Sequence, residues 1–408
     1  MASLVTNVYI LLFFFGIYFI VIFLLLHYRN YKRLYKNPEV KRFPFVSFLV
    51  PAYNEEKSLE ETVNALLNVH YPEDKKEIII INDGSRDGTA KIATRLAKSH
   101  KEVTFLDKKN SGKADSLNKA IKIAKGELIA VVDADSYPDK NALMNMVGHF
   151  EERGVAAVTS RVLVKNKNNL LCKFQVLDYS IIAWTRKLLD FVDSVYVTNG
   201  PLSLYKTSVV KKIGGFDTKN LTEDIEITWH ILDQGYKTRM SYSAIVYTTV
   251  PEDLNYWIKQ RVRWNLGGLQ TVQKYWKSMF KNNAFGYFVI PYVSSSFALA
   301  ILGFLLLLRF FWIKGGYYFY SLYYFFEGYS FWKYIDFNIY ASLLFILGII
   351  FLALAVYYYK KGFKNSETGN QRVINILAYA FLYRSLYIIP LLMAIYKLVK
   401  GDIRWYTK

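Results

Sequence analysis

The chain is poor in the residues that build disulfides and metal clusters. Cys172 is its only cysteine, so no intrachain disulfide can form and nothing indicates an oxidising compartment. We expect Cys172 to be a small buried hydrophobe rather than a nucleophile or a metal ligand. The histidines show no metal-ligand spacing, and no internal repeat is evident. They are His27, His70, His100, His149 and His230.

Acidic residues are the scarcer charged class. The 408 residues include 52 Lys and Arg against 33 Asp and Glu, which gives a formal net charge of +19. No zinc-finger, basic-zipper or RNA-binding signature accompanies this charge, so we expect no nucleic-acid partner. Basic loops beside membrane spans, facing anionic lipids and an anionic substrate, explain the charge better.

Long hydrophobic runs are concentrated near the two ends of the chain. Hydrophobic residues make up 53% and aromatic residues 17%, more than a soluble globule needs. The uncharged run Val8–Leu26 is long enough to span a bilayer and lacks the basic start and cleavage site of a secretory signal. We therefore predict a retained membrane helix within residues 1–27. Basic residues only on its downstream side put the following domain in the cytosol, at the plasma membrane.

The C-terminal region, residues 285–400, is predicted to hold about three further spans. Phe285–Leu308, Ile339–Tyr359 and Val373–Leu398 are the apolar segments of sufficient length. The aromatic stretch Phe310–Tyr334 could be an external interfacial helix, an aromatic belt or one more span. Lysines just after residue 359 favour a cytosolic loop and four spans in total, although the basic tail would then lie outside, against the charge rule.

Residues 40–250 alternate short β-branched runs with amphipathic segments, which predicts a mostly parallel sheet with helices on both faces. Ligands bind such sheets beyond the carboxyl ends of the strands, where residues 51–55, 82–85 and 133–135 place polar motifs. Residues 251–284, with three tryptophans among Lys and Arg, are predicted to form interfacial amphipathic helices. The expected strands are Val46–Val50, Glu77–Ile81, Val103–Leu106 and Leu128–Val132, and the expected helices are Leu59–Asn68, Gly88–Ser99, Ala114–Lys125 and Asn141–Glu152.

Asp133-Ala134-Asp135 follows the last of these strands directly. Alternate carboxylates at a strand end can share one divalent cation, and that cation can bridge two phosphates. An isolated triplet of this kind is as often a solvated turn. Its position at the crevice of an α/β sheet favours the metal site.

Single side chains near the other strand ends add candidate nucleotide ligands. Asp83 could accept hydrogen bonds from a ribose or a base, or belong to an Asx turn. Tyr53 could stack on a base or be an ordinary boundary tyrosine. Lys113 follows Gly112 and could neutralise a diphosphate, but the second glycine and the Ser or Thr of a Walker loop are missing, which argues against an ATPase.

Thr222-Glu223-Asp224 is predicted to open a helix over Ile225–Leu232, with Thr222 as its cap. A carboxylate at a helix start is often only a capping residue. The alternative is a general base that removes a proton from an acceptor hydroxyl, and a helix N-terminus favours the ionised form that this role requires. Of the two acids, Asp224 is the expected base, with Glu223 beside it.

Two further segments suggest contacts with a substrate. Asn199–Tyr205 is predicted to be a turn entering a strand, and backbone exposed at Gly200 could line a narrow acceptor path or be purely structural. Gln260-Arg261-Val262-Arg263-Trp264 lies just before the hydrophobic block at residue 285. Guanidinium groups bind phosphates bidentately and an indole face suits stacking on a sugar, whereas the plain alternative is a surface helix with snorkelling arginines.

In this order, Asp133–Asp135, Thr222–Asp224 and Gln260–Trp264 resemble the motifs of processive, membrane-embedded members of glycosyltransferase family 2. That group includes cellulose, chitin, hyaluronan and poly-N-acetylglucosamine synthases. The similarity covers roughly residues 44–268 and the plan of spans around them. It implies an α/β GT-A (Rossmann-like) cytosolic catalytic domain inserted between transmembrane α-helices, a UDP-sugar donor, Mg²⁺ or Mn²⁺, and inversion to a β linkage.

The resemblance also implies a role for each candidate side chain. Asp224 matches the catalytic base, Asp135 the likeliest metal ligand, and Trp264 the support for the acceptor sugar at the pore entrance. The other residues would bind the donor: its uridine through Tyr53 and Asp83, and its diphosphate and metal through Lys113, Asp133, Gln260 and Arg263.

The activity that this resemblance implies is polymerisation of a sugar from a UDP-sugar onto a growing glycan, with export across the membrane. Membrane lipids and an accessory export subunit would be further partners. Transfer of a single sugar to a lipid, as in glucosylceramide synthases, is the alternative, and an inactive scaffold is a third hypothesis. The sugar stays open: Thr222–Asp224 is similar to cellulose and poly-N-acetylglucosamine enzymes, whereas Asn199–Ser203 is closer to the hyaluronan and chitin group, which usually has Cys or Ser at position 199. Short length and Gln260–Gly268 slightly favour poly-N-acetylglucosamine.

Overall fold

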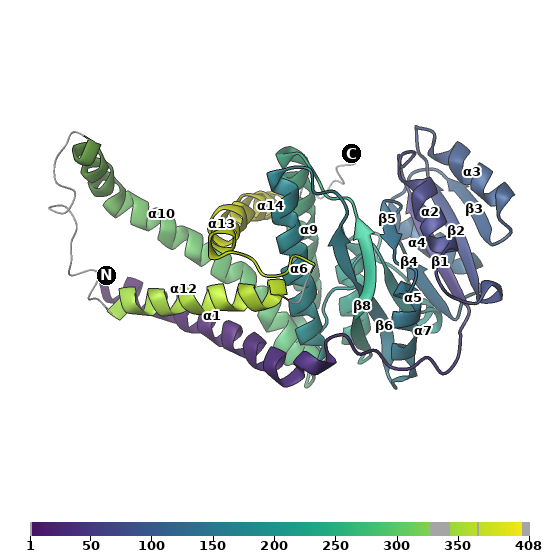
Figure 1. The fold of residues 1–408 in the computed structure, drawn as a ribbon, viewed down its shortest axis with the longest axis horizontal. Helices are drawn as coiled ribbons and strands as arrows, with labels where there is room; N and C mark the ends of the chain where they lie inside the picture. Colours follow the sequence, from purple (N-terminus) through teal and green to yellow (C-terminus); the bar gives the residue numbers. More distant parts are fainter. Residues whose placement is uncertain (1, 327–342, 365–366, 402–408) are drawn as a thin grey trace.

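The computed structural model describes residues 2–326, 343–364 and 367–401. Figure 1 shows a sheet domain on one side of the molecule and long helices that extend away from it on the other. Helices α6 and α9 stand between these two parts. The chain therefore places one pair of helices against both the sheet and the apolar helices.

The sheet has eight strands in the order β3-β2-β1-β4-β7-β6-β8-β5. Its first four strands are parallel, as the alternating pattern predicts, and β7 then runs antiparallel to both β4 and β6. The parallel strands are β1 (Val46–Ala52), β2 (Lys76–Asp83), β3 (Val103–Lys108) and β4 (Leu128–Val131). The others are β5 (Ser136–Pro138), β6 (Val155–Val164), β7 (Ser203–Lys206) and β8 (Lys237–Thr248).

Apolar side chains of each central strand alternate between two buried cores, one on each face of the sheet. In β2, for example, Ile78 and Ile80 belong to one core and Ile79 and Ile81 to the other. Helices α2 (Leu59–Leu67), α3 (Thr89–Ser99) and α5 (Ala142–Val147) cover the first face, and α4 (Lys113–Ile123), α7 (Thr207–Lys212) and α8 (Glu223–Asp233) cover the second. The expected α/β domain is confirmed, and Cys172 is buried as expected.

Four helical segments among the described residues are long and apolar enough to cross a membrane: Asn7–Arg33, Phe285–Ile313, Ile346–Lys364 and Val373–Lys400. The first comprises most of α1 (Ala2–Asn30) and a 3-10 turn (Tyr31–Arg33), and the second a π-helical turn (Phe285–Val289) and the start of α10 (Ile290–Phe326). The third lies within α12 (Leu343–Lys364), and the last is made of α13 (Val373–Ala378), a π-helical turn (Tyr379–Tyr383), a 3-10 turn (Arg384–Tyr387) and α14 (Ile388–Lys400). The ambiguous aromatic stretch begins as a continuation of α10, and residues 327–334 of it lie outside the described residues.

Helices α6 (Leu170–Asp190) and α9 (Leu254–Tyr275) connect the sheet domain to the apolar helices. Trp184 of α6 and Trp257 of α9 are fully buried in a core that also contains Phe23 of α1 and Phe363 of α12. Trp257 is thus an interior anchor and not an exposed tryptophan of an interfacial helix. Its indole N–H donates to the Tyr383 hydroxyl at 3.0 Å.

A single buried carboxylate, that of Asp178 in α6, joins these elements. Its Oδ1 lies 3.3 Å from Arg384 of the last apolar segment, and its Oδ2 lies 3.6 Å from Arg261 of α9. Asp178 and Arg261 are almost fully buried, so each of these two charges depends on the other, whereas the Arg384 side chain is 44% exposed. Three tyrosine hydroxyls spaced four residues apart also donate to it, from Tyr379, Tyr383 and Tyr387.

Asp178→Ala is expected to destabilise the protein by about 3–5 kcal/mol, because it leaves the buried Arg261 guanidinium without its carboxylate. The free energy of unfolding of the detergent-solubilised protein measures this loss. Asp74→Ala removes an exposed aspartate from the same domain and is the control. Equal stability of the two variants would show that Asp178 does not hold the two parts of the molecule together.

Candidate active site

The carboxyl ends of β1, β2 and β4 place the predicted polar residues along one edge of the sheet. Ala52 of β1 pairs with Asn82 of β2, so Tyr53 and Asp83 lie at adjacent strand ends. Asp133 and Asp135 are half-buried just beyond β4, with Ala134 buried between them. The edge that the topology rule predicts is therefore the one where these residues gather.

Lys113, the first residue of α4, bridges two of the predicted motifs. Its ammonium lies 2.6 Å from Asp133 and 2.6 Å from Glu223. Burial lowers the pKa of Lys113, but the charges of Asp133, Glu223 and Asp224 outweigh burial and raise the pKa above its ordinary value. A permanent cation thus stands between the strand-end acids and the start of α8.

Gly200 lies directly against this ion pair. A Cβ at position 200 would lie 2.6 Å from Oδ2 of Asp133 and 2.9 Å from Nζ of Lys113. The residue is buried, so of the two alternatives for this turn the structural one agrees with the observed burial. A larger residue at this position would therefore displace the ends of the Asp133 and Lys113 side chains.

Asp224 follows Glu223 in α8 but, unlike Glu223, forms no ion pair with Lys113 in the described structure. Its own Ile225 N–H donates to its carboxylate at 2.9 Å. Burial raises the pKa of Asp224 most, the neighbouring Glu223 raises it further, and Lys113 and Arg263 lower it, which leaves it at about 6. The sequence predicted that the helix N-terminus would favour the ionised form of Asp224. In the structure, burial and the like charge of Glu223 outweigh that effect and raise the pKa.

Thr222 occupies the cap position of α8, but its hydroxyl forms no capping hydrogen bond to the helix. The hydroxyl instead donates to Oδ1 of Asn220 at 3.2 Å. A Cβ at Gly267 of α9 would clash with Thr222, so α9 reaches the start of α8 only because position 267 is a glycine. This contact, and the one from Asn220 to Thr271 at 2.9 Å, fix α8 against α9.

Asp83 organises the loop that carries Lys113. Its carboxylate accepts from the backbone N–H groups of Ser111 and Gly112, both at 2.9 Å, and pairs with Lys108. Gly112 has a φ of +94°, which glycine tolerates best. The Asx-type contact in this turn belongs to Asn82, which accepts from Ser85 N–H at 3.2 Å.

The side chains of Gln260–Trp264 in α9 point in two directions, some into the protein interior and others toward the candidate site. Arg261 is buried, and its guanidinium donates to Gln260 at 2.6 Å and to Tyr387 at 2.9 Å. It does not face a phosphate site, because Asp178 and the tyrosines enclose it. Arg263 is half-buried and close enough to Asp224 to lower its pKa. Trp264 has the Arg261 guanidinium 4.0 Å from its ring centroid.

The donor set at the end of β4 fits a divalent cation. Mg²⁺ and Mn²⁺ prefer carboxylate oxygens and commonly complete their shells with substrate phosphates and water. Asp133 is paired with Lys113, and Asp135 accepts a hydrogen bond from the Ser136 hydroxyl at 3.4 Å, so both carboxylates are candidate ligands. No group of three or more potential metal-ligating side chains occurs in the described part of the chain. Substrate phosphates would therefore have to supply part of the shell.

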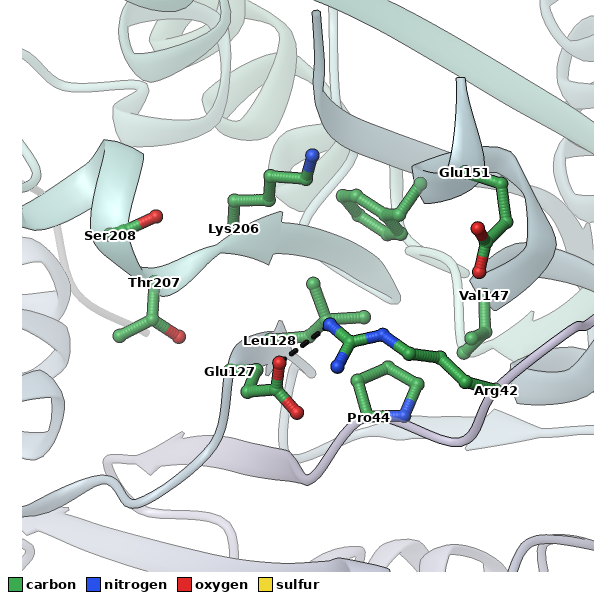
Figure 2. Close-up of a pocket in the computed structure, with 10 residues that line it drawn as sticks. Arg42, Pro44, Glu127, Leu128, Val147, Glu151, Lys206, Thr207 and Ser208 are labelled. Carbon is green, nitrogen blue, oxygen red and sulfur yellow. Dashed lines mark hydrogen bonds and ion pairs between the residues drawn. The ribbon is translucent and has the colours of Figure 1, made fainter. Parts of the chain in front are cut away.

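A cavity of about 470 Å³ lies at the opposite edge of the sheet, beside the amino ends of β1 and β4. Figure 2 shows Arg42 paired with Glu127 at 2.6 Å in this cavity, with Lys206 across from them. None of the sequence-predicted site residues lines it. We therefore assign the active site to the carboxyl edge, where the acids and Lys113 meet.

Helix α6 adds residues that sequence reasoning missed. The ring centroid of Tyr179 lies 6.5 Å from that of Trp264, and Arg186 donates to the Asn199 amide oxygen at 2.5 Å. Their spacing of seven residues puts both on one face of the helix. An amphipathic pattern over residues 170–190 could have revealed the helix, but no local motif marks the two residues as site residues.

Part of the chain is similar to a known family of glycosyltransferases. Residues 47–214 match the family described as Glycosyl transferase family 2, the family that the motifs resemble. A mannosyltransferase from Pyrobaculum calidifontis, solved in complex with GDP-Man and Mn²⁺, matches with a TM-score of 0.58 at 21% sequence identity. That match covers 96% of this chain and 98% of the other, and it confirms the GT-A fold.

Curated relatives include a Poly-beta-1,6-N-acetyl-D-glucosamine synthase from Staphylococcus epidermidis, 35% identical over 252 residues. The protein of the same name from Staphylococcus aureus (strain COL) is 33% identical over 264 residues. The first match covers 60% of this chain and 60% of the relative, and the second 64% and 63%. The chain thus matches somewhat less than two thirds of the length of either relative.

Gly200→Ala is expected to weaken binding of UDP roughly tenfold or more, because the added methyl group displaces the Asp133–Lys113 pair. Calorimetric titration of the purified protein with UDP measures the effect. Gly303→Ala is the matched control, since a Cβ there would meet nothing within 4 Å. UDP binding by Gly200→Ala at the affinity of the control would contradict a role of this pair in the nucleotide site.

Proposed function

We propose that the protein is a membrane-embedded, inverting hexosyltransferase that builds a β-linked N-acetylglucosamine polymer from UDP-N-acetylglucosamine. The observation that carries the proposal is the bridge from Asp133 through Lys113 to Glu223. It joins a strand-end diphosphate site to the helix that carries a candidate base. The two Staphylococcus relatives support N-acetylglucosamine as the sugar.

The donor nucleotide would lie over the carboxyl ends of β1, β2 and β4. Tyr53 and Asp83 would contact the uridine, with Asp83 also holding the loop before Lys113. Lys113, Gln260 and Arg263 would surround the diphosphate. A divalent cation held by Asp135, with Asp133 beside it, would supply further positive charge to the phosphates.

Transfer would proceed by direct displacement at the anomeric carbon. Asp224 accepts the proton of the acceptor hydroxyl, and the oxygen forms its bond to the anomeric carbon as the bond from that carbon to the phosphate oxygen breaks. The leaving UDP gains negative charge, which the cations Lys113 and Arg263 stabilise. Glu223 is occupied by Lys113, which favours Asp224 as the base.

The acceptor would approach along α6 and α9. Trp264 offers a ring for a sugar, with Tyr179 next to it and Gly200 beneath the ion pair. The apolar segments beside these helices would hold the enzyme in the plasma membrane with its catalytic domain in the cytosol. Translocation of the glycan, contacts with lipids and an accessory export subunit are parts of the same proposal.

Purified protein incubated with single radiolabelled UDP-sugars is expected to produce a ladder of long chains from UDP-N-acetylglucosamine. Asp224→Asn should abolish the ladder, because an amide cannot accept the proton. Gel sizing and solvent partition of the products measure the outcome. One-sugar glycolipids would show a single-transfer enzyme, and UDP release that persists in Asp224→Asn would indicate that this residue is not the base.

The rate of transfer is expected to fall as the pH drops through about 6, because protonated Asp224 cannot accept the hydroxyl proton. Above that pH the carboxylate is ionised, and below it kcat/KM should fall by about tenfold per pH unit. Initial rates between mildly acidic and neutral pH measure this, with folding checked by circular dichroism at each pH. If kcat/KM instead falls only near the ordinary pKa of an aspartate, Asp224 is not the base that controls the reaction.

A further inference from the structure

Arg186 is a positive charge that the proposed reaction does not use. It lies on α6, is half-buried, and its guanidinium donates to Oδ1 of Asn199 at 2.5 Å. Within the described residues it forms no ion pair with a carboxylate. Burial lowers the pKa of Arg186, with Tyr196 and Asp224 acting in the opposite direction. A cation kept here without a partner carboxylate costs free energy unless it binds something.

The neighbours of Arg186 place it on the acceptor side of the site. Its partner Asn199 follows Thr198, whose hydroxyl donates to the backbone carbonyl of Asp224 at 3.4 Å. On the same face of α6, the ring of Tyr179 approaches Trp264. Asn199 precedes Gly200, which lies against Lys113 and Asp133. Among the described residues, no hydrogen-bond partner of Arg186 belongs to the strand ends where the nucleotide would lie. The guanidinium therefore lies beside the place of the acceptor hydroxyl.

We propose that Arg186 selects the acceptor sugar, donating to the carbonyl oxygen of an acetamido group and repelling an acceptor that carries a free amine. This inference rests on the proposed function. A guanidinium has five N–H donors and no acceptor, so one donor can stay on Asn199 while others bind a carbonyl oxygen. The same fixed charge repels a sugar ammonium group, which discriminates more strongly than one contact does.

Asn199 holds the guanidinium in place. Its amide oxygen also accepts from Thr159 at 2.5 Å, its N–H donates to the Thr159 hydroxyl at 3.1 Å, and its carbonyl accepts from Ser203 at 2.8 Å. With its backbone and amide both fixed, Asn199 has little freedom to turn. Its amide oxygen therefore fixes the direction of the Arg186 guanidinium. A cysteine or serine at position 199 has a shorter side chain and would hold the guanidinium at a different position.

Full-length protein supplied with UDP-N-acetylglucosamine tests the proposal with two acceptors: a β-1,6-linked N-acetylglucosamine tetrasaccharide and its de-N-acetylated counterpart, at a pH where the amines are protonated. The wild type should prefer the N-acetylated acceptor. Arg186→Gln should lower kcat/KM for the N-acetylated acceptor about tenfold, because a charged hydrogen bond is lost. The ratio of kcat/KM between the N-acetylated and the de-N-acetylated acceptor should therefore become smaller. Arg186→Lys keeps the charge and should retain the rejection of the amine.

Lys173→Gln removes an exposed cation of α6 and should leave both acceptors and the preference unchanged. UDP affinity, measured by calorimetry, should be the same in all variants and shows that each one folds. Equal loss for both acceptors in Arg186→Gln would make the residue merely structural, and weaker UDP binding would place it in the donor site; either result overturns the inference. A wild type that transfers no sugar from UDP-N-acetylglucosamine overturns the proposed function itself.

Discussion

The buried carboxylate of Asp178 is the contact on which the relation between the sheet domain and the apolar helices depends. It lies in α6 and is approached by Arg261 of α9 and Arg384 of the last apolar segment. Burying the charges of Asp178 and Arg261 is costly, and their attraction offsets that cost only in a favourable arrangement. The cluster therefore specifies which helices meet and in what register. Hydrophobic packing around Trp184 and Trp257 would tolerate many arrangements of similar energy, whereas this ion cluster tolerates few.

The candidate active site also depends on one charge placed between two charges of the opposite sign, but here the central charge is a cation and the two flanking charges are carboxylates. One lysine, Lys113, stands between Asp133 and Glu223, so two acids are held close together without strong repulsion. The site then has one further acid, Asp224, whose pKa burial and Glu223 raise to about 6. A base with such a pKa is ionised at neutral pH and still accepts a proton readily. The raised pKa of Asp224 thus follows first from burial and then from the neighbouring Glu223.

The elements that could be predicted from the sequence are those whose signal is local. Strands β1 to β4 and helices α2 to α4 follow from the period of their apolar residues, and the strand-end rule places Asp83 and Asp133. The pairing of Lys113 with Glu223 joins residues 110 positions apart, and no local pattern encodes it. Arg261 and Arg263 must face different sides of α9, since neighbours two apart diverge on a helix. Which of them is buried depends on Asp178, which comes from another helix.

Helix α6 has no catalytic motif, yet it connects the membrane side of the molecule with the acceptor side. Asp178 faces the tyrosines of the last apolar segment, while the adjacent Tyr179 approaches Trp264. Arg261 contacts both, through the Asp178 carboxylate and through the Trp264 ring at 4.0 Å. A shift of the last apolar segment would therefore move Arg261 and Trp264 together, because the Tyr387 hydroxyl also accepts a hydrogen bond from Arg261. One group of side chains in this way links the packing of the last apolar segment to the position proposed for the acceptor.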